Sequence, residues 1–85
     1  MPRPRGARKQ WRCAICGQLL FGNEDCALHP GQLRVEWNSE FRQAYAIQAD
    51  LIRRGKEPLK LAGAAGIRYD RAARYVRLWE QERAS

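Results

Sequence analysis

The sequence predicts a mainly α-helical protein in which a small cysteine-rich hairpin precedes three helices. All three cysteines and the only histidine lie between residues 13 and 29, and apolar residues recur every three or four positions after residue 38. Such a recurrence is typical of helices that bury one face. We therefore expect a flexible basic arm at 1–10, a cysteine-rich module at 11–35 and a three-helix unit at 36–85.

Size and composition limit the kinds of protein that this chain can be. A chain of 85 residues has a thin core, because domains of about 60 residues bury only about 60% of their unfolded surface. Its hydrophobic content of 45% argues against complete disorder, so we expect a metal or a partner to supplement the core. No segment resembles a signal peptide or the roughly 18 apolar residues of a membrane span. We expect an intracellular, cytoplasmic protein with reduced thiols and no membrane partner.

The spacing of cysteine and histidine predicts a metal site. Cys13 and Cys16 form a Cys-x2-Cys pair, Cys26 and His29 form a Cys-x2-His pair, and nine residues separate the two pairs. Two residues between ligands let a tight turn aim both side chains at one point, and nine residues suffice for a hairpin that joins the pairs. Three thiolates and one imidazole suit Zn2+, and four protein ligands leave no open position for water. We predict one structural zinc ion; the alternative is a set of buried free cysteines.

The stretch CAICGQLLFGNEDCALHPG resembles zinc-knuckle and zinc-ribbon modules. Gly17 directly after the first pair fits the turn of a knuckle, because glycine accepts positive φ without penalty. Gly22 and Asn23 fit a chain reversal before the second pair. The resemblance implies metal binding and leaves the function open.

Residues 1–12 have the character of a basic arm. They include two prolines, one glycine and no acidic residue, a composition that discourages helix formation. Such an arm can follow a phosphate backbone or enter a minor groove, or it can act only as a solubilising tail. Its cations are Arg3, Arg5, Arg8, Lys9 and Arg12.

Helical periodicity predicts three helices, at 38–54, 58–65 and 69–82. The first has Asn38 or Ser39 as its N-cap and stops before Gly55. Pro58 suits the first turn of the second helix, and Gly66 ends that helix. The positions expected to face the core are Phe41, Ala44, Tyr45, Leu51 and Ile52, with Gln48 interrupting the stripe, and then Ala72, Tyr75, Val76 and Trp79.

The segment LKLAGAAGIRYDRAARYVRLWE resembles the helix-turn-helix of ParB-type partition proteins, sigma factors and recombinase tail domains. Ala62 matches the small residue at the helix crossing, Gly66 the turn, and Ile67 the apolar plug that follows it. The resemblance implies a mainly α protein in which the zinc-bound hairpin is followed by a three-helix helix-turn-helix unit. Helix 69–82 would then enter the major groove of double-stranded DNA.

The resemblance also implies roles for charged residues. An arginine in the major groove can contact guanine with two hydrogen bonds, so Arg71 and Arg74 are the expected base-reading residues. The N-terminus of the recognition helix would be formed by Arg68, Tyr69 and Asp70. Phosphate contacts are expected from Lys56, Lys60, Arg77, Arg3, Arg5, Arg8 and Lys9.

The sequence indicates a binding protein and not an enzyme. It has no carboxylate pair and no Gly-rich phosphate loop, and zinc uses its one histidine, so we expect no small-molecule substrate. We expect a DNA-binding regulator or an accessory factor of partition, recombination or a mobile element. One helix-turn-helix of this size seldom binds tightly alone, so we expect a homodimer, a protein partner or extra DNA contacts from the arm. A net charge of +7 favours a nucleic-acid partner, and it fits RNA as well as DNA.

Two further interpretations stay open. One is an adaptor that docks on a polymerase or recombinase subunit through the zinc module or helix 38–54, burying Trp37, Phe41 or Trp79. The other is a plain three-helix unit whose arginines form a solvated face.

Overall fold

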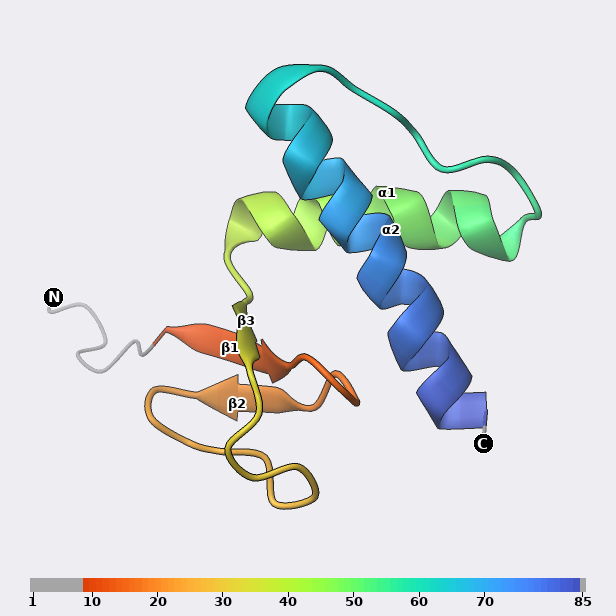
Figure 1. Cartoon of the computed structure of the whole chain (residues 1–85). Helices are drawn as coiled ribbons and strands as arrows, with labels where there is room; N and C mark the ends of the chain where they lie inside the picture. The colour runs from red at the N-terminus through yellow and green to blue at the C-terminus, as the bar shows by residue number, and fades with distance from the viewer. Residues whose placement is uncertain (1–8, 85) are drawn as a thin grey trace, which may run out of the picture.

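A computed structural model describes residues 9–84 and shows a three-stranded sheet beside two crossing helices (Figure 1). Of the predicted arm, only Lys9 and Gln10 lie within the described residues. Helices hold most of the regular structure, but the expected hairpin is a full antiparallel sheet. The elements are β1 (Gln10–Cys13), β2 (Leu19–Phe21), β3 (Arg34–Glu36), α1 (Ser39–Arg53) and α2 (Gly63–Ala84).

The central strand of the sheet is β1, and the strand order is β2-β1-β3. Trp11 lies opposite Leu20 of β2 and Glu36 of β3, which sets the register on both sides. The strands are only three or four residues long, so the sheet buries little on its own. Cys13 is the last residue of β1, and the connections on either side of β2 carry the other metal-ligand candidates, Cys16, Cys26 and His29.

Helix α1 forms close to the predicted range, because its N-cap and its apolar face agree. The Asn38 side chain accepts a hydrogen bond from the Phe41 backbone N–H at 2.8 Å, which satisfies one of the free donors of the first turn. The face toward α2 buries Phe41, Ala44, Gln48 and Ala49.

The prediction of a three-helix helix-turn-helix unit is wrong. The structure has no separate helix at 58–65: residues 58–62 are not helical, and α2 begins at Gly63 and continues without a break through the expected turn at Gly66. The side chain of Gln48 holds the connection extended: it donates to the Leu59 carbonyl at 2.9 Å and accepts from the Leu59 N–H at 2.8 Å. Since both backbone groups of Leu59 are bonded in this way, they are not available to a helix.

Gly66 serves a different purpose from the one predicted. It is not among the positive-φ glycines, so it forms no left-handed turn. A Cβ built at Gly66 would lie 2.1 Å from the Leu61 carbonyl oxygen, well inside van der Waals contact. Glycine is needed here because the connection passes against the first turn of α2.

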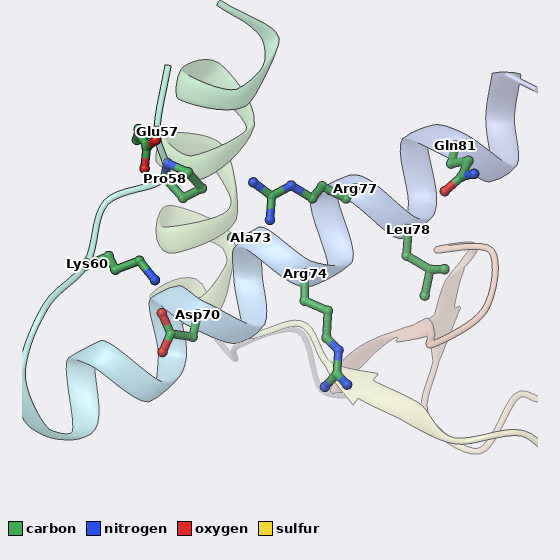
Figure 2. Close-up of a pocket in the computed structure, with 9 residues that line it drawn as sticks. All are labelled: Glu57, Pro58, Lys60, Asp70, Ala73, Arg74, Arg77, Leu78 and Gln81. Atoms are coloured by element: carbon green, nitrogen blue, oxygen red, sulfur yellow. The ribbon is translucent and has the colours of Figure 1, made fainter. Parts of the chain in front are cut away.

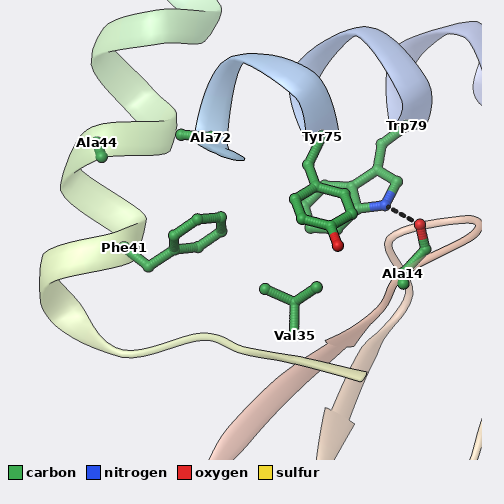
Figure 3. Close-up of a cluster of buried hydrophobic side chains, with 7 residues drawn as sticks. All are labelled: Ala14, Val35, Phe41, Ala44, Ala72, Tyr75 and Trp79. Carbon is green, nitrogen blue, oxygen red and sulfur yellow. Dashed lines mark hydrogen bonds between the residues drawn. The ribbon is translucent and has the colours of Figure 1, made fainter. Parts of the chain in front are cut away.

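The two helices share one hydrophobic core with β3 and the turn after β1 (Figure 3), and a second, smaller cluster holds Cys13, Leu20 and Cys26. Trp37, just after β3, lies edge-on to Phe41 and Tyr45, with ring centroids 5.7 and 5.3 Å away. This core joins the ligand-bearing part of the chain to the helices. Its buried members are Ala14, Val35, Phe41, Ala44, Ala72, Tyr75 and Trp79.

Neither α1 nor α2, as far as the structure describes them, combines the length and the apolar character needed to cross a membrane.

Candidate metal centre and basic surface

The four predicted ligands come together at one point. Their ligating atoms, three sulfurs and one imidazole nitrogen, all lie within 4.8 Å of one another. Cys16 Sγ is 3.7 Å from Cys26 Sγ, and His29 Nδ1 is 3.8 Å from Cys13 Sγ and 3.7 Å from Cys26 Sγ. A tetrahedral ion with bonds of about 2.3 Å to sulfur and about 2.0 Å to nitrogen requires separations of about 3.5 to 3.8 Å. The cluster has the size that a metal ion needs.

The first pair is positioned by the end of β1 and the turn that follows it. Cys13 is the last residue of β1, and its carbonyl accepts a hydrogen bond from the Gly17 N–H at 2.8 Å. Gly17 has φ of 79°, a conformation that reverses the chain and that other residues rarely adopt. The turn therefore brings Cys16 back toward Cys13, as the knuckle resemblance implied.

The second pair is held by a residue that the sequence analysis did not identify. Asp25 accepts from the Cys26 N–H at 3.0 Å through one oxygen and from the Gly31 N–H at 2.9 Å through the other. One carboxylate thus holds both ends of the loop that carries Cys26 and His29. An aspartate directly before a ligand is the available signal, because Asp side chains commonly bond nearby backbone N–H groups.

A second support outside the ligand set is Arg34 of β3. Its guanidinium Nη1 donates to the carbonyls of Gly22 and Glu24, both at 2.9 Å. Its Cζ also lies 4.7 Å from the centroid of the Trp11 ring, within the range of a cation–π contact. Arg34 therefore joins β3 to the connection that leads from β2 to the second ligand pair.

Burial and hydrogen bonding set the protonation of the thiols. Cys13 and Cys26 are buried, whereas Cys16 is half-buried. Burial raises the pKa of Cys16 to about 11. At Cys26 burial acts in the same direction, but hydrogen bonds from His29 and the backbone outweigh it and lower the pKa to about 7. A thiol like Cys16 loses its proton at neutral pH only when a cation compensates the charge, so metal binding here releases protons.

The predicted recognition-helix residues do not lie at a helix N-terminus. They fall in the second turn of α2, since the helix begins at Gly63. Arg68 is half-buried with Nη2 3.8 Å from Glu40 of α1, and the Tyr69 carbonyl accepts from Gln48 at 3.0 Å. This part of the prediction is corrected: Arg68 and Tyr69 contact α1, and only Asp70 is exposed.

Other predicted DNA contacts are exposed on the helical part of the chain. Arg71, Arg74 and Arg77, here called the arginine face, lie exposed along α2, and Lys56 and Lys60 lie exposed in the connection before it. Of the arm cations, Lys9 and Arg12 are described: Lys9 Nζ is 3.6 Å from Glu36, and Arg12 lies in β1, where its guanidinium donates to the Gly17 carbonyl. Arg3, Arg5 and Arg8 lie outside the described residues.

A groove of about 600 Å³ separates the connection from α2 (Figure 2). Figure 2 shows Lys60 and Asp70 facing each other across it, with Arg77 extending toward Pro58 and Arg74 extending away from the connection. Lys60 of the connection and two members of the arginine face, Arg74 and Arg77, therefore line the same groove.

Comparison with known protein families, with curated proteins and with solved structures finds no match to this chain.

Proposed function

We propose that the chain is a zinc-containing protein that binds double-stranded DNA through the arginine face of α2. The observation that carries the proposal is the arrangement of Arg71, Arg74 and Arg77. All three are exposed on one helix, and none forms an ion pair with a residue whose side chain the structure describes. Exposed arginines with no ion pair among the described side chains are available to phosphates and to base edges.

The dimensions of α2 support this proposal. Helical residues rise about 1.5 Å each, so Arg71 and Arg77 are about 9 Å apart along the axis, and the major groove is about 12 Å wide. Arg71 and Arg74 are the proposed base-reading residues. Arg77 extends toward the connection that carries Lys60 (Figure 2), so these two cations are proposed phosphate contacts, together with Lys56 of the same connection.

The proposed cofactor is one structural zinc ion held by Cys13, Cys16, Cys26 and His29. Three thiolates and one imidazole are a donor set that zinc prefers, and a reducing, cytoplasmic compartment would keep the thiols available. The ion would hold the turn after β1 against the loop between β2 and β3. No position is left for a substrate, so the proposed role of the metal is structural.

The test compares arginines on two helices. A duplex is first selected from random sequences with the zinc-loaded chain. Arg71→Ala and Arg74→Ala should each weaken binding to that duplex by about 1 to 3 kcal/mol and relax the preference at one base pair. Arg42→Ala is the matched control, because Arg42 is an exposed arginine of α1 and its loss removes the same charge. If the α2 variants lose no more affinity than the control, α2 is not the DNA-binding surface.

A second candidate function is a protein adaptor that docks through the metal-binding loop. Leu28 and Leu33 flank His29 and are 75% and 68% exposed, which is unusual for leucine. The helix 38–54 is less suited to docking than expected, since its Phe41 is buried in the core. Of the other two aromatic residues expected at a docking surface, Trp79 of α2 is buried and Trp37 is half-buried. Leu28→Ser with Leu33→Ser should leave DNA binding unchanged if α2 binds DNA, and should abolish capture of a polymerase or recombinase subunit if the adaptor proposal holds.

A further inference from the structure

We infer that metal occupancy of the Cys3His cluster controls how α2 packs on the rest of the molecule, through a contact between Trp79 and the turn at residues 13–17. The inference concerns communication between two parts of the chain. It does not require DNA binding.

Trp79 both packs closely on this turn and forms a hydrogen bond with it. A Cβ built at Gly17 would lie 2.8 Å from Cγ and Cδ2 of Trp79, so the backbone of the turn lies directly against the indole. The indole Nε1 donates a hydrogen bond to the Ala14 carbonyl at 3.2 Å (Figure 3). Trp79 is 1% exposed, and this bond supplies the partner that a buried indole N–H needs.

The same turn carries two of the four ligands. Ala14 and Gly17 lie within or next to the Cys13–Cys16 pair, so ligation of both sulfurs fixes the backbone that Trp79 contacts. Without a cation the turn is held by hydrogen bonds alone: the Cys13 N–H donates to Gln18, the Ala14 N–H to Leu33, the Gly17 N–H to Cys13, and the Arg12 guanidinium to the Gly17 carbonyl. Loss of the metal should therefore make the backbone at Gly17, on which the indole packs, and the Ala14 carbonyl, to which it donates, more mobile.

Trp79 passes the effect on to both helices. Its ring stacks on Tyr75 of α2, with centroids 5.0 Å apart, and lies 5.3 Å from Tyr45 of α1. A second link runs through Arg12, whose Nη1 donates to the Gly17 carbonyl at 2.6 Å while its guanidinium lies 4.3 Å from the Trp37 ring centroid. The turn at residues 13–17 and the aromatic residues of the core therefore pack as one unit.

Coupling of this kind is reciprocal, because a metal that stabilises the docked helix is itself bound more tightly when the helix is docked. Arg77 lies two residues before Trp79 on the same helix. On the basis of the proposed function, metal occupancy would then also determine how the arginine face is presented to DNA; this consequence rests on that proposal, whereas the coupling does not.

Two glycines provide a matched pair for the test. Gly17 and Gly55 have φ of 79° and 74°, so an alanine is strained similarly at both, but a Cβ at Gly55 meets nothing within 4 Å, and Gly55 lies after α1, outside both ligand-bearing segments. Gly17→Ala should weaken zinc affinity, measured by competition with a chromogenic chelator, by about tenfold more than Gly55→Ala. Trp79→Phe, which removes the indole N–H and keeps an aromatic ring, should weaken it in the same direction. Equal zinc affinity of the two glycine variants together with unchanged affinity of Trp79→Phe would overturn the inference.

Hydrogen exchange of the full chain gives the second readout. Amides of residues 72–82 should exchange faster after zinc removal by a chelator and should regain protection when zinc is restored. Unchanged exchange in this segment would also overturn the inference. Neither measurement contains DNA, so failure of the coupling leaves the DNA proposal standing, and failure of the DNA proposal leaves the coupling standing.

Discussion

Gln48 shows how a single buried polar side chain can decide the course of the backbone. It is 0% exposed and uses its amide to bond the N–H and carbonyl of Leu59 and the carbonyl of Tyr69. The amide thereby replaces the partners that a helix would have supplied to the connection. A residue that interrupts the apolar stripe of α1 is therefore an essential part of its packing.

Replacing Gln48 should destabilise the fold. Gln48→Leu leaves the Leu59 and Tyr69 backbone groups without their partner, and a buried unsatisfied group costs about 1 to 3 kcal/mol. Gln43→Leu is the control, because Gln43 is an exposed glutamine of the same helix. Urea unfolding of both zinc-loaded variants measures the difference. Equal unfolding free energies would show that the amide of Gln48 holds nothing in place.

Gly66 offers a second test at the scale of one residue. Glycine to alanine in a helix ordinarily stabilises by about 1 kcal/mol. Here the added Cβ would meet the Leu61 carbonyl oxygen at 2.1 Å, so Gly66→Ala should destabilise. Thermal unfolding gives the sign directly, and a raised melting temperature would contradict the close approach of the connection.

At the scale of elements, the continuity of α2 separates this fold from a helix-turn-helix. In that motif Ile67 would be the apolar plug behind the turn. In the structure it is 64% exposed in the second turn of α2, so Ile67→Ala should change stability by less than about 0.5 kcal/mol. Val76→Ala, at a fully buried position of the same helix, should cost about 2 kcal/mol. Similar losses for the two variants would favour the three-helix arrangement.

The same elements show what could be predicted and what could not. The grouping of Cys13, Cys16, Cys26 and His29 could be predicted from their spacing, because a short turn within each pair and a short hairpin between the pairs bring the four side chains together. Helix α1 followed from its N-cap Asn38 and its stripe, which are local features. The extended connection before α2 could not be predicted in this way, because the hydrogen bonds that hold it join Gln48 to Leu59, 11 positions away in the sequence. Gly66 was assigned to a turn because a glycine that accepts positive φ and one that permits close contact look identical in sequence.

At the scale of the whole molecule, the excess of positive charge predicts a strong salt dependence of DNA binding. If about five or six phosphates are neutralised, the slope of log affinity against log salt should be about −4 to −6. Deleting residues 2–8 removes Arg3, Arg5 and Arg8 and keeps the Lys9–Glu36 ion pair, so the slope should flatten by up to about 3. An unchanged slope would mean that the arm acts only as a solubilising tail.

One zinc ion is proposed to join the turn after β1 to the loop before β3. X-ray absorption at the zinc edge, on chain purified under reducing conditions without chelator, measures the number and identity of its ligands. We predict one zinc per chain, with three sulfur neighbours at about 2.3 Å and one nitrogen neighbour at about 2.0 to 2.1 Å. Protein that is folded but free of zinc, or a zinc ion with fewer than three sulfur neighbours, would contradict the claim.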